Sequence, residues 1–198
     1  MPYPNRIAAT LALACATVAI VAVAATGRFD PSAYPNGGFD PVQDKTYASE
    51  CGSCHFAYLP GLLPARSWQA IISNADRHFG ESLSLAPDTA KQLQEYLTAN
   101  AADHSNRLGS ELMIERLRAS ATPTRITDLP LFKQRHFSVL FTLKAVPKMD
   151  TVSPLPPSAI KVVLNCNDCH QRAASGSFAE KEIVVKGLTK VVRPGGYF

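Results

Sequence analysis

The chain has 198 residues and a formal net charge of +4, and 46% of its residues are hydrophobic against 18% charged. This length suits one compact domain or two small ones and excludes a large multidomain enzyme. The composition is that of a folded globular protein and excludes wholesale disorder and a collagen-like chain. Because no run of Lys and Arg is present, we expect no nucleic-acid partner.

The N-terminus predicts export from the cytoplasm. Arg6 precedes twenty residues without a charge, Ile7–Thr26, and this run ends in small residues around Ala24. A basic residue, an apolar stretch and a small-residue cleavage site are typical of a signal peptide. Twenty helical residues also span about 30 Å, which is long enough for an uncleaved anchor. Residues 1–26 are therefore interpreted as a signal peptide or N-terminal anchor of a periplasmic protein, which contacts the membrane only if this segment is uncleaved.

The remaining cysteines form two copies of one motif. Apart from Cys15 in the N-terminal segment, all cysteines lie in CGSCH at 51–55 and CNDCH at 166–170. In a CxxCH motif the two thiols bond to the haem vinyl groups, and the adjacent histidine binds the iron as its proximal ligand. The sequence therefore predicts two covalently bound haem c groups. The attachment residues are Cys51, Cys54, Cys166 and Cys169, and the proximal iron ligands are His55 and His170.

Three other uses of these cysteines fit less well. Two disulfides are reasonable in an exported chain but leave both histidines unexplained. A zinc ion shared by the two CxxC pairs would close a gap of 112 residues, from Cys54 to Cys166, whereas compact zinc ribbons close roughly 15 to 20. A thioredoxin-type site needs a βαβ setting, which neither flank provides. Haem attachment alone uses all four cysteines and both histidines.

The sixth position of each iron decides between an electron carrier and a catalyst. A side chain in that position closes the iron to small ligands, whereas an empty position permits oxygen or peroxide chemistry. Three histidines are left for two irons, and two methionines compete with them. These candidates are His78, His104, His136, Met113 and Met149.

His78 is the candidate for the first iron. It ends a segment in which apolar residues from Trp68 onward recur at intervals of three to four, so we expect it on or beside the apolar face of a helix. The alternative for His78 is a histidine packed in the core. His104 lies in a polar stretch at a predicted helix end, and we expect it in solvent.

His136 is the candidate for the second iron. It lies four residues after Phe132 and three before Val139, which is consistent with an apolar helix face, although Phe137–Leu143 also alternates like a strand. We therefore predict His78 as the distal ligand of the first haem and His136 as that of the second. A crossed pairing, and a replacement of either residue by His104, stay open.

The rest of the pattern predicts a mainly α-helical protein. An apolar loop at 56–64, with two prolines and a glycine, suits the edge of a haem. We expect two small haem-binding lobes of cytochrome c type with long loops, 27–124 and 125–198, because covalent cofactors supply apolar volume that a short chain lacks. Further helices are expected at 42–55, 87–101, 111–119 and 158–170, and a few short strands at 183–185 and 191–192.

Charge is unevenly distributed between these two parts. Residues 27–124 carry 8 Lys+Arg against 11 Asp+Glu, whereas residues 125–198 carry 11 against 5. A basic face beside a haem would steer an acidic redox partner toward it. The alternative is a solvated surface that only keeps the protein soluble.

A longer pattern surrounds both motifs. Its first half is ECGSCHFAYLPGLLPARSW at 50–68, followed by RHFGE at 77–81. Its second half is RIT at 125–127, Phe132 and His136, then the residues from Asn165 through Ala173 and those at 176–178. Over nearly the whole mature chain this pattern resembles the exported dihaem cytochromes c. The apolar segment FSVLFTL after His136 departs from the family, whose members are usually polar there.

The resemblance implies an electron carrier and not an enzyme, and it also favours His78 and His136 as the distal ligands. Some family members resemble donors to a small oxygen-binding monohaem cytochrome and receive electrons from a membrane cytochrome b, so these are the implied partners. Bis-histidine ligation lowers the reduction potential relative to a histidine–methionine pair, so we expect a low-potential shuttle. Two alternatives remain. One is a haem enzyme or ligand-binding protein with one open iron, such as a peroxidase, and the other is a reductase subunit anchored by residues 7–26.

Overall fold

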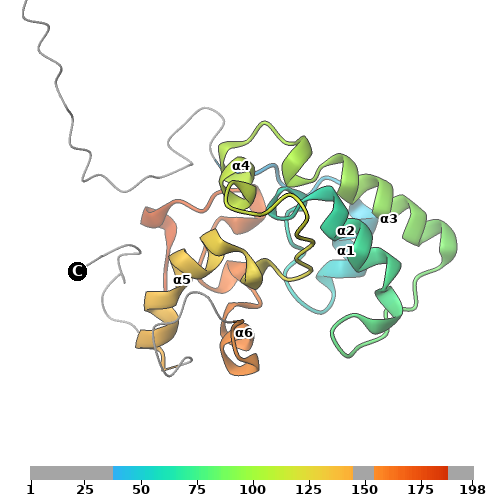
Figure 1. The fold of residues 1–198 in the computed structure, drawn as a ribbon. Coiled ribbons are helices and arrows are strands. Elements are labelled where there is room, and N and C mark those ends of the chain that lie inside the picture. The colour runs from blue at the N-terminus through green and yellow to red at the C-terminus, as the bar shows by residue number, and fades with distance from the viewer. Residues whose placement is uncertain (1–37, 145–153, 187–198) are drawn as a thin grey trace, which may run out of the picture.

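The structure is a computed structural model that describes residues 38–144 and 154–186, and these residues form short helices joined by turns (Figure 1). The α-helices are α1 (Lys45–Gly52), α2 (Ala65–Ser73), α3 (Pro87–Ala99), α4 (Leu108–Ile114), α5 (Pro130–Thr142) and α6 (Pro157–Val163). The 3-10 helices η2 to η8 are Pro60–Leu62, Ala75–Arg77, Ala102–His104, Ile126–Asp128, Cys166–Asp168, Ala173–Ser175 and Glu180–Glu182. Within the described residues β structure is limited to two isolated bridges, His78 with Glu81 and His170 with Ile183. The expectation of a mainly α-helical protein is confirmed.

Local sequence signals explain where several helices begin. The Asp44 side chain accepts a hydrogen bond of 2.7 Å from the backbone N–H of Tyr47 and caps α1. Helices α3, α5 and α6 each begin with a proline, which has no N–H to leave unpaired and a φ angle suited to the first helical turn. The first motif lies at the end of α1, and the second motif begins just after α6.

The segment between the first motif and α2 is part of the core. Leu59 and Leu63 are each 1% exposed, and the Trp68 indole N–H donates a hydrogen bond of 2.7 Å to the carbonyl of Pro60. The Tyr47 hydroxyl donates to the carbonyl of Tyr58 at 2.7 Å. The predicted apolar loop at 56–64 is therefore packed into the core directly after the first motif.

Contacts cross between the two predicted lobes. Figure 1 shows α1, α2 and α3 on one side and α5 and α6 on the other, and one hydrophobic cluster runs through both sides from Phe39 to Ala159. The backbone N–H of Phe39 donates to the carbonyl of Gly176 at 3.0 Å. Gly176 has φ +84°, and a Cβ there would collide with the Phe39 carbonyl, so glycine is required at this junction. The division at 124–125 stays a prediction.

Several predicted elements differ from the structure. The helix expected at 111–119 begins earlier, at Leu108, and ends at Ile114, and the one expected at 158–170 stops at Val163. The backbone leaves α6 there because Leu164 and Asn165 form hydrogen bonds with the segment after the first motif. The strand expected at 183–185 is reduced to the single bridge at Ile183, and 191–192 lies outside the described residues.

No helix of the described ranges, 38–144 and 154–186, is long and apolar enough to cross a membrane. The predicted signal peptide or anchor at 1–26 lies outside these ranges.

Candidate haem sites

The first candidate site pairs His55 with His78. Their ring centroids are 6.3 Å apart, and the planes of the two imidazoles differ by 18°. A metal ion bonds an imidazole nitrogen at about 2 Å, so two rings on opposite sides of one ion have centroids about 6 Å apart. The separation of the two ring centroids therefore matches that of two imidazoles bound to one iron.

Local contacts orient the His55 imidazole. Its Nδ1 lies 2.8 Å from the carbonyl of Phe56, and because a carbonyl only accepts, Nδ1 carries the proton. The Tyr58 ring packs against the imidazole with centroids 4.9 Å apart. The other ring nitrogen, Nε2, is left unprotonated, which is the form that binds a metal.

The position of His78 corrects the sequence prediction. Helix α2 ends at Ser73, and the short helix at 75–77 follows, so His78 is not on a helix face. Asn74 terminates α2, because its backbone N–H bonds the carbonyls of Ile71 and Ile72. His78 instead begins a turn in which the Glu81 N–H donates to the His78 carbonyl at 3.0 Å. The turn brings the imidazole opposite His55.

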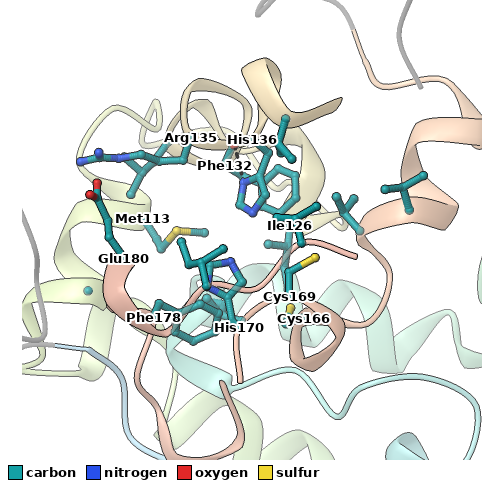
Figure 2. A pocket seen from close by; sticks show the side chains of 18 of the residues that line it. Met113, Ile126, Phe132, Arg135, His136, Cys166, Cys169, His170, Phe178 and Glu180 are labelled. Carbon is teal, nitrogen blue, oxygen red and sulfur yellow. Dashed lines mark hydrogen bonds between the residues drawn. The ribbon is translucent and has the colours of Figure 1, made fainter. Parts of the chain in front are cut away.

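The second candidate site pairs His136 with His170. Figure 2 shows the two imidazoles on opposite sides of a cavity, with Cys166 and Cys169 beside His170. The ring centroids are 6.0 Å apart, and the planes differ by 65°. This pair has the spacing of one metal ion as well, but its rings are turned relative to each other.

Helix α5 fixes the His136 imidazole, and this confirms the expected helical position of His136. Its Nδ1 lies 2.9 Å from the Phe132 carbonyl one turn earlier, and the ring stacks on the Phe132 ring at 3.9 Å with 11° between the planes. The segment at 137–143 is helical up to Thr142, so the alternative of a strand is wrong. Its apolar residues Val139 and Leu143 line the cavity.

Burial favours the neutral form of His78, His136 and His170. Burial, reinforced by the neighbouring His136, lowers the pKa of His170 to about 4. Burial lowers the pKa of His136, an effect that its hydrogen bond to Phe132 opposes in part. The pKa of His78 is lowered by burial, then by His55 and by the charge of Arg125. A neutral imidazole is what iron ligation requires.

The cysteines and the cavity walls also fit covalent haem. All four motif cysteines are free thiols, and burial raises the pKa of Cys51 to about 11 and that of Cys166 to about 12. The cavity is lined mainly by apolar residues, as a porphyrin requires. Nδ1 of His170 is buried without a hydrogen-bond partner in the described structure. In the described residues no group of three or more His, Cys, Asp or Glu converges as a metal site of another kind.

The competing ligands are placed differently. His104 is exposed, as expected, and its Nδ1 lies 2.7 Å from the Thr98 carbonyl. Met113 is 6% exposed and lines the second cavity, so it is the one competitor that the described structure brings to a haem site. Met149 lies outside the described residues.

The sequence analysis missed the residues that join the two sites. The side-chain oxygen of Asn165 accepts a hydrogen bond of 2.9 Å from the Phe56 N–H, and the Tyr58 hydroxyl donates to the Leu164 carbonyl at 2.8 Å. The segment just after the first motif is thereby bonded to the residues just before the second. No periodicity signals such a contact across more than 100 positions. The only hint was the place of Asn165 directly before Cys166.

Comparison with known proteins decides the family. The model of the dihaem cytochrome c family matches residues 47–178, which include both motifs and both histidine pairs. The chain belongs to the dihaem cytochrome c family. It therefore carries two covalently bound haem c groups with iron. Membership supports a role as a haem c electron carrier and is consistent with a carrier in preference to an enzyme.

Solved structures agree with this assignment. The diheme cytochrome c from Rhodobacter sphaeroides is 35% identical and superposes with a TM-score of 0.54, covering 70% of this chain and 98% of that chain. The diheme cytochrome type c from Shewanella baltica OS155 is 29% identical, with a TM-score of 0.51 and coverage of 74% and 96%. No curated protein sequence matches the chain.

Proposed function

We propose that this dihaem cytochrome c is an exported electron shuttle in which both irons are closed by histidine pairs. His55 and His78 would hold the first iron, and His170 and His136 the second. The observation that carries the proposal is the separation of the ring centroids, 6.3 Å in the first pair and 6.0 Å in the second. Closed coordination suits electron exchange and leaves no position for a substrate.

The side chains around each pair hold the ligands in place. Cys51 and Cys54 anchor the first group and Cys166 and Cys169 the second, and the haem c iron supplies a centre that gains and releases one electron. The hydrogen bonds of His55 to Phe56 and of His136 to Phe132 fix the tautomer and the ring orientation. Ligands held in this way do not need to move when the charge of the site changes.

The ligand pair at each iron supports a low reduction potential. Two imidazoles favour ferrous iron less than an imidazole with a methionine thioether does. At the second site the apolar cavity wall acts in the opposite direction: it favours the less charged reduced form and so raises the reduction potential.

We propose a periplasmic location and two redox partners, a membrane cytochrome b as donor and a small monohaem cytochrome as acceptor. The uncharged run at 7–26 supports export, and the family resemblance supports the partners. The basic face proposed for docking includes Lys181 and Lys186, which are both exposed. Lys186 is close enough to Cys169 to lower the pKa of its thiol against the effect of burial. Lys190 and Arg193 belong to the same sequence stretch but lie outside the described residues.

The test of the ligand set is the spin state of the two irons without added ligand. Wild-type protein should show two low-spin irons in both oxidation states, and His78→Ala and His136→Ala should each convert one of them to high spin. His104→Ala is the matched control and should leave both low-spin. A high-spin iron in the wild type, together with peroxide turnover, would instead support the alternative of a haem enzyme with an open position.

A further inference from the structure

The two distal histidines are held in very different ways. His136 lies on α5, with Nδ1 bonded to the Phe132 carbonyl and its ring stacked on Phe132. His78 lies in a four-residue turn outside any helix, closed by the Glu81 N–H on the His78 carbonyl. Moving the His136 imidazole away from His170 would break its hydrogen bond to Phe132 and its stacking on the Phe132 ring, whereas moving His78 away from His55 requires only movement of this turn. We call residues 78–81 the His78 turn.

The His78 turn is strained and lies at the surface. Phe79 has φ +54°, in the left-handed region that residues with a Cβ rarely adopt, and the next residue, Gly80, has φ +109°. Phe79 is also 46% exposed, unusually open for a phenylalanine. Strain of this kind persists only where surrounding contacts compensate for it. The contacts of the Phe79 ring are therefore expected to decide how firmly the turn stays in place.

One such contact comes from the other half of the chain. The guanidinium carbon of Arg125 lies 3.9 Å from the centroid of the Phe79 ring, a cation–π arrangement. Arg125 directly precedes the short helix at 126–128, which packs against α5. The His78 turn is thus fastened to the segment that leads to the second haem site.

We infer that the first iron is a gated binding site for a neutral diatomic ligand such as carbon monoxide, and that the Arg125–Phe79 contact keeps the gate closed. His78 would hold the sixth position of the first iron, and an outward movement of the His78 turn would free that position, so that one bond to the iron would be exchanged for another. No electron or proton is exchanged in this step. The second iron stays closed, because His136 is held by α5. The inference rests on the proposed ligation of the first iron by His78.

The first experiment measures carbon monoxide binding to the reduced holoprotein by stopped flow. Loss of a cation–π contact at a partly exposed position should raise the population of the open turn, and with it the binding rate, roughly two- to fivefold. We expect this increase for Phe79→Leu and for Arg125→Gln, a smaller one for Arg125→Lys, and no additional increase in the double variant. Arg118→Gln, which removes an exposed arginine elsewhere, is the control and should match the wild type. The amplitude should correspond to one haem of two.

The second experiment follows the turn itself by hydrogen exchange of the Glu81 amide. Exchange should be faster in Phe79→Leu and Arg125→Gln than in the wild type, in proportion to the binding rates. Equal binding rates in all variants, or binding at the second iron, would overturn the gate. A failure of the underlying ligation is recognised separately, because His78→Ala would then leave the first iron low-spin.

Discussion

The hydrogen bond between Asn165 and Phe56 joins the two haem sites, so its removal should destabilise the whole protein. In Asn165→Ala the Phe56 N–H loses its acceptor at 2.9 Å in a partly buried position. Leaving such a donor unpaired costs about 1–3 kcal/mol of unfolding free energy. For a chain of this size that corresponds to a fall in the unfolding midpoint of roughly 2–12 °C. Asn165→Asp retains an acceptor and should lose less.

The assay is thermal and denaturant unfolding of the holoprotein, followed by far-UV circular dichroism and by haem absorbance. The control is Asn167→Ala, which alters an exposed asparagine within the same motif and should change the midpoint little. The two signals should move together, because the bond ties both sites to one unfolding unit. If Asn165→Ala unfolds at the wild-type midpoint, or if only the second site is lost early, the two sites are not coupled through this bond.

Three further changes test the packing and the docking face. Leu140→Ala, at a residue 1% exposed on α5, should reduce the unfolding free energy by about 2–5 kcal/mol in denaturant titrations, and a smaller loss would mean that the site collapses around the missing volume. Gly176→Ala should be at least as damaging, because the new Cβ collides with the Phe39 carbonyl, and normal expression with wild-type stability would refute this. Lys186→Glu should slow electron transfer to an acidic partner, and the wild-type rate should fall with added salt as the Debye length shrinks to about 8 Å. If neither Lys186→Glu nor added salt changes the rate of electron transfer, the basic face has no role in recognition.

The haem motifs were predictable because their chemistry is local. Two cysteines and a histidine must lie within five consecutive positions to bond one porphyrin and its iron, so the pattern is complete in the sequence. His136 was also predictable, because helical spacing from Phe132 places it on an apolar face, and that spacing survives in α5.

His78 shows what periodicity does not determine. Its apolar spacing predicted a helix, yet Asn74 ends α2 and a strained turn presents the imidazole. The sequence pointed to His78 as a candidate ligand but not to the turn that holds it. A positive φ at Phe79 and a contact of its ring with Arg125, far along the chain, leave no periodic signal. The early end of α6 has the same origin, since hydrogen bonds from Phe56 and Tyr58 override the local helix signal.

The most direct test of the histidine pairs is electron paramagnetic resonance of the fully oxidised protein. The imidazole planes of His55 and His78 are nearly parallel, 18° apart. The π orbitals of both rings then interact with the same iron d orbital, and the low-spin iron gives a rhombic signal. The planes of His136 and His170 are 65° apart, so that each ring interacts with a different iron d orbital. Such an iron gives a strongly anisotropic low-spin signal with one large g value. The structure predicts one signal of each kind in equal amounts, with the rhombic one lost in His78→Ala and the anisotropic one in His136→Ala. A high-spin signal in the wild type, or a histidine–methionine charge-transfer band in the near infrared, would contradict bis-histidine ligation of both irons.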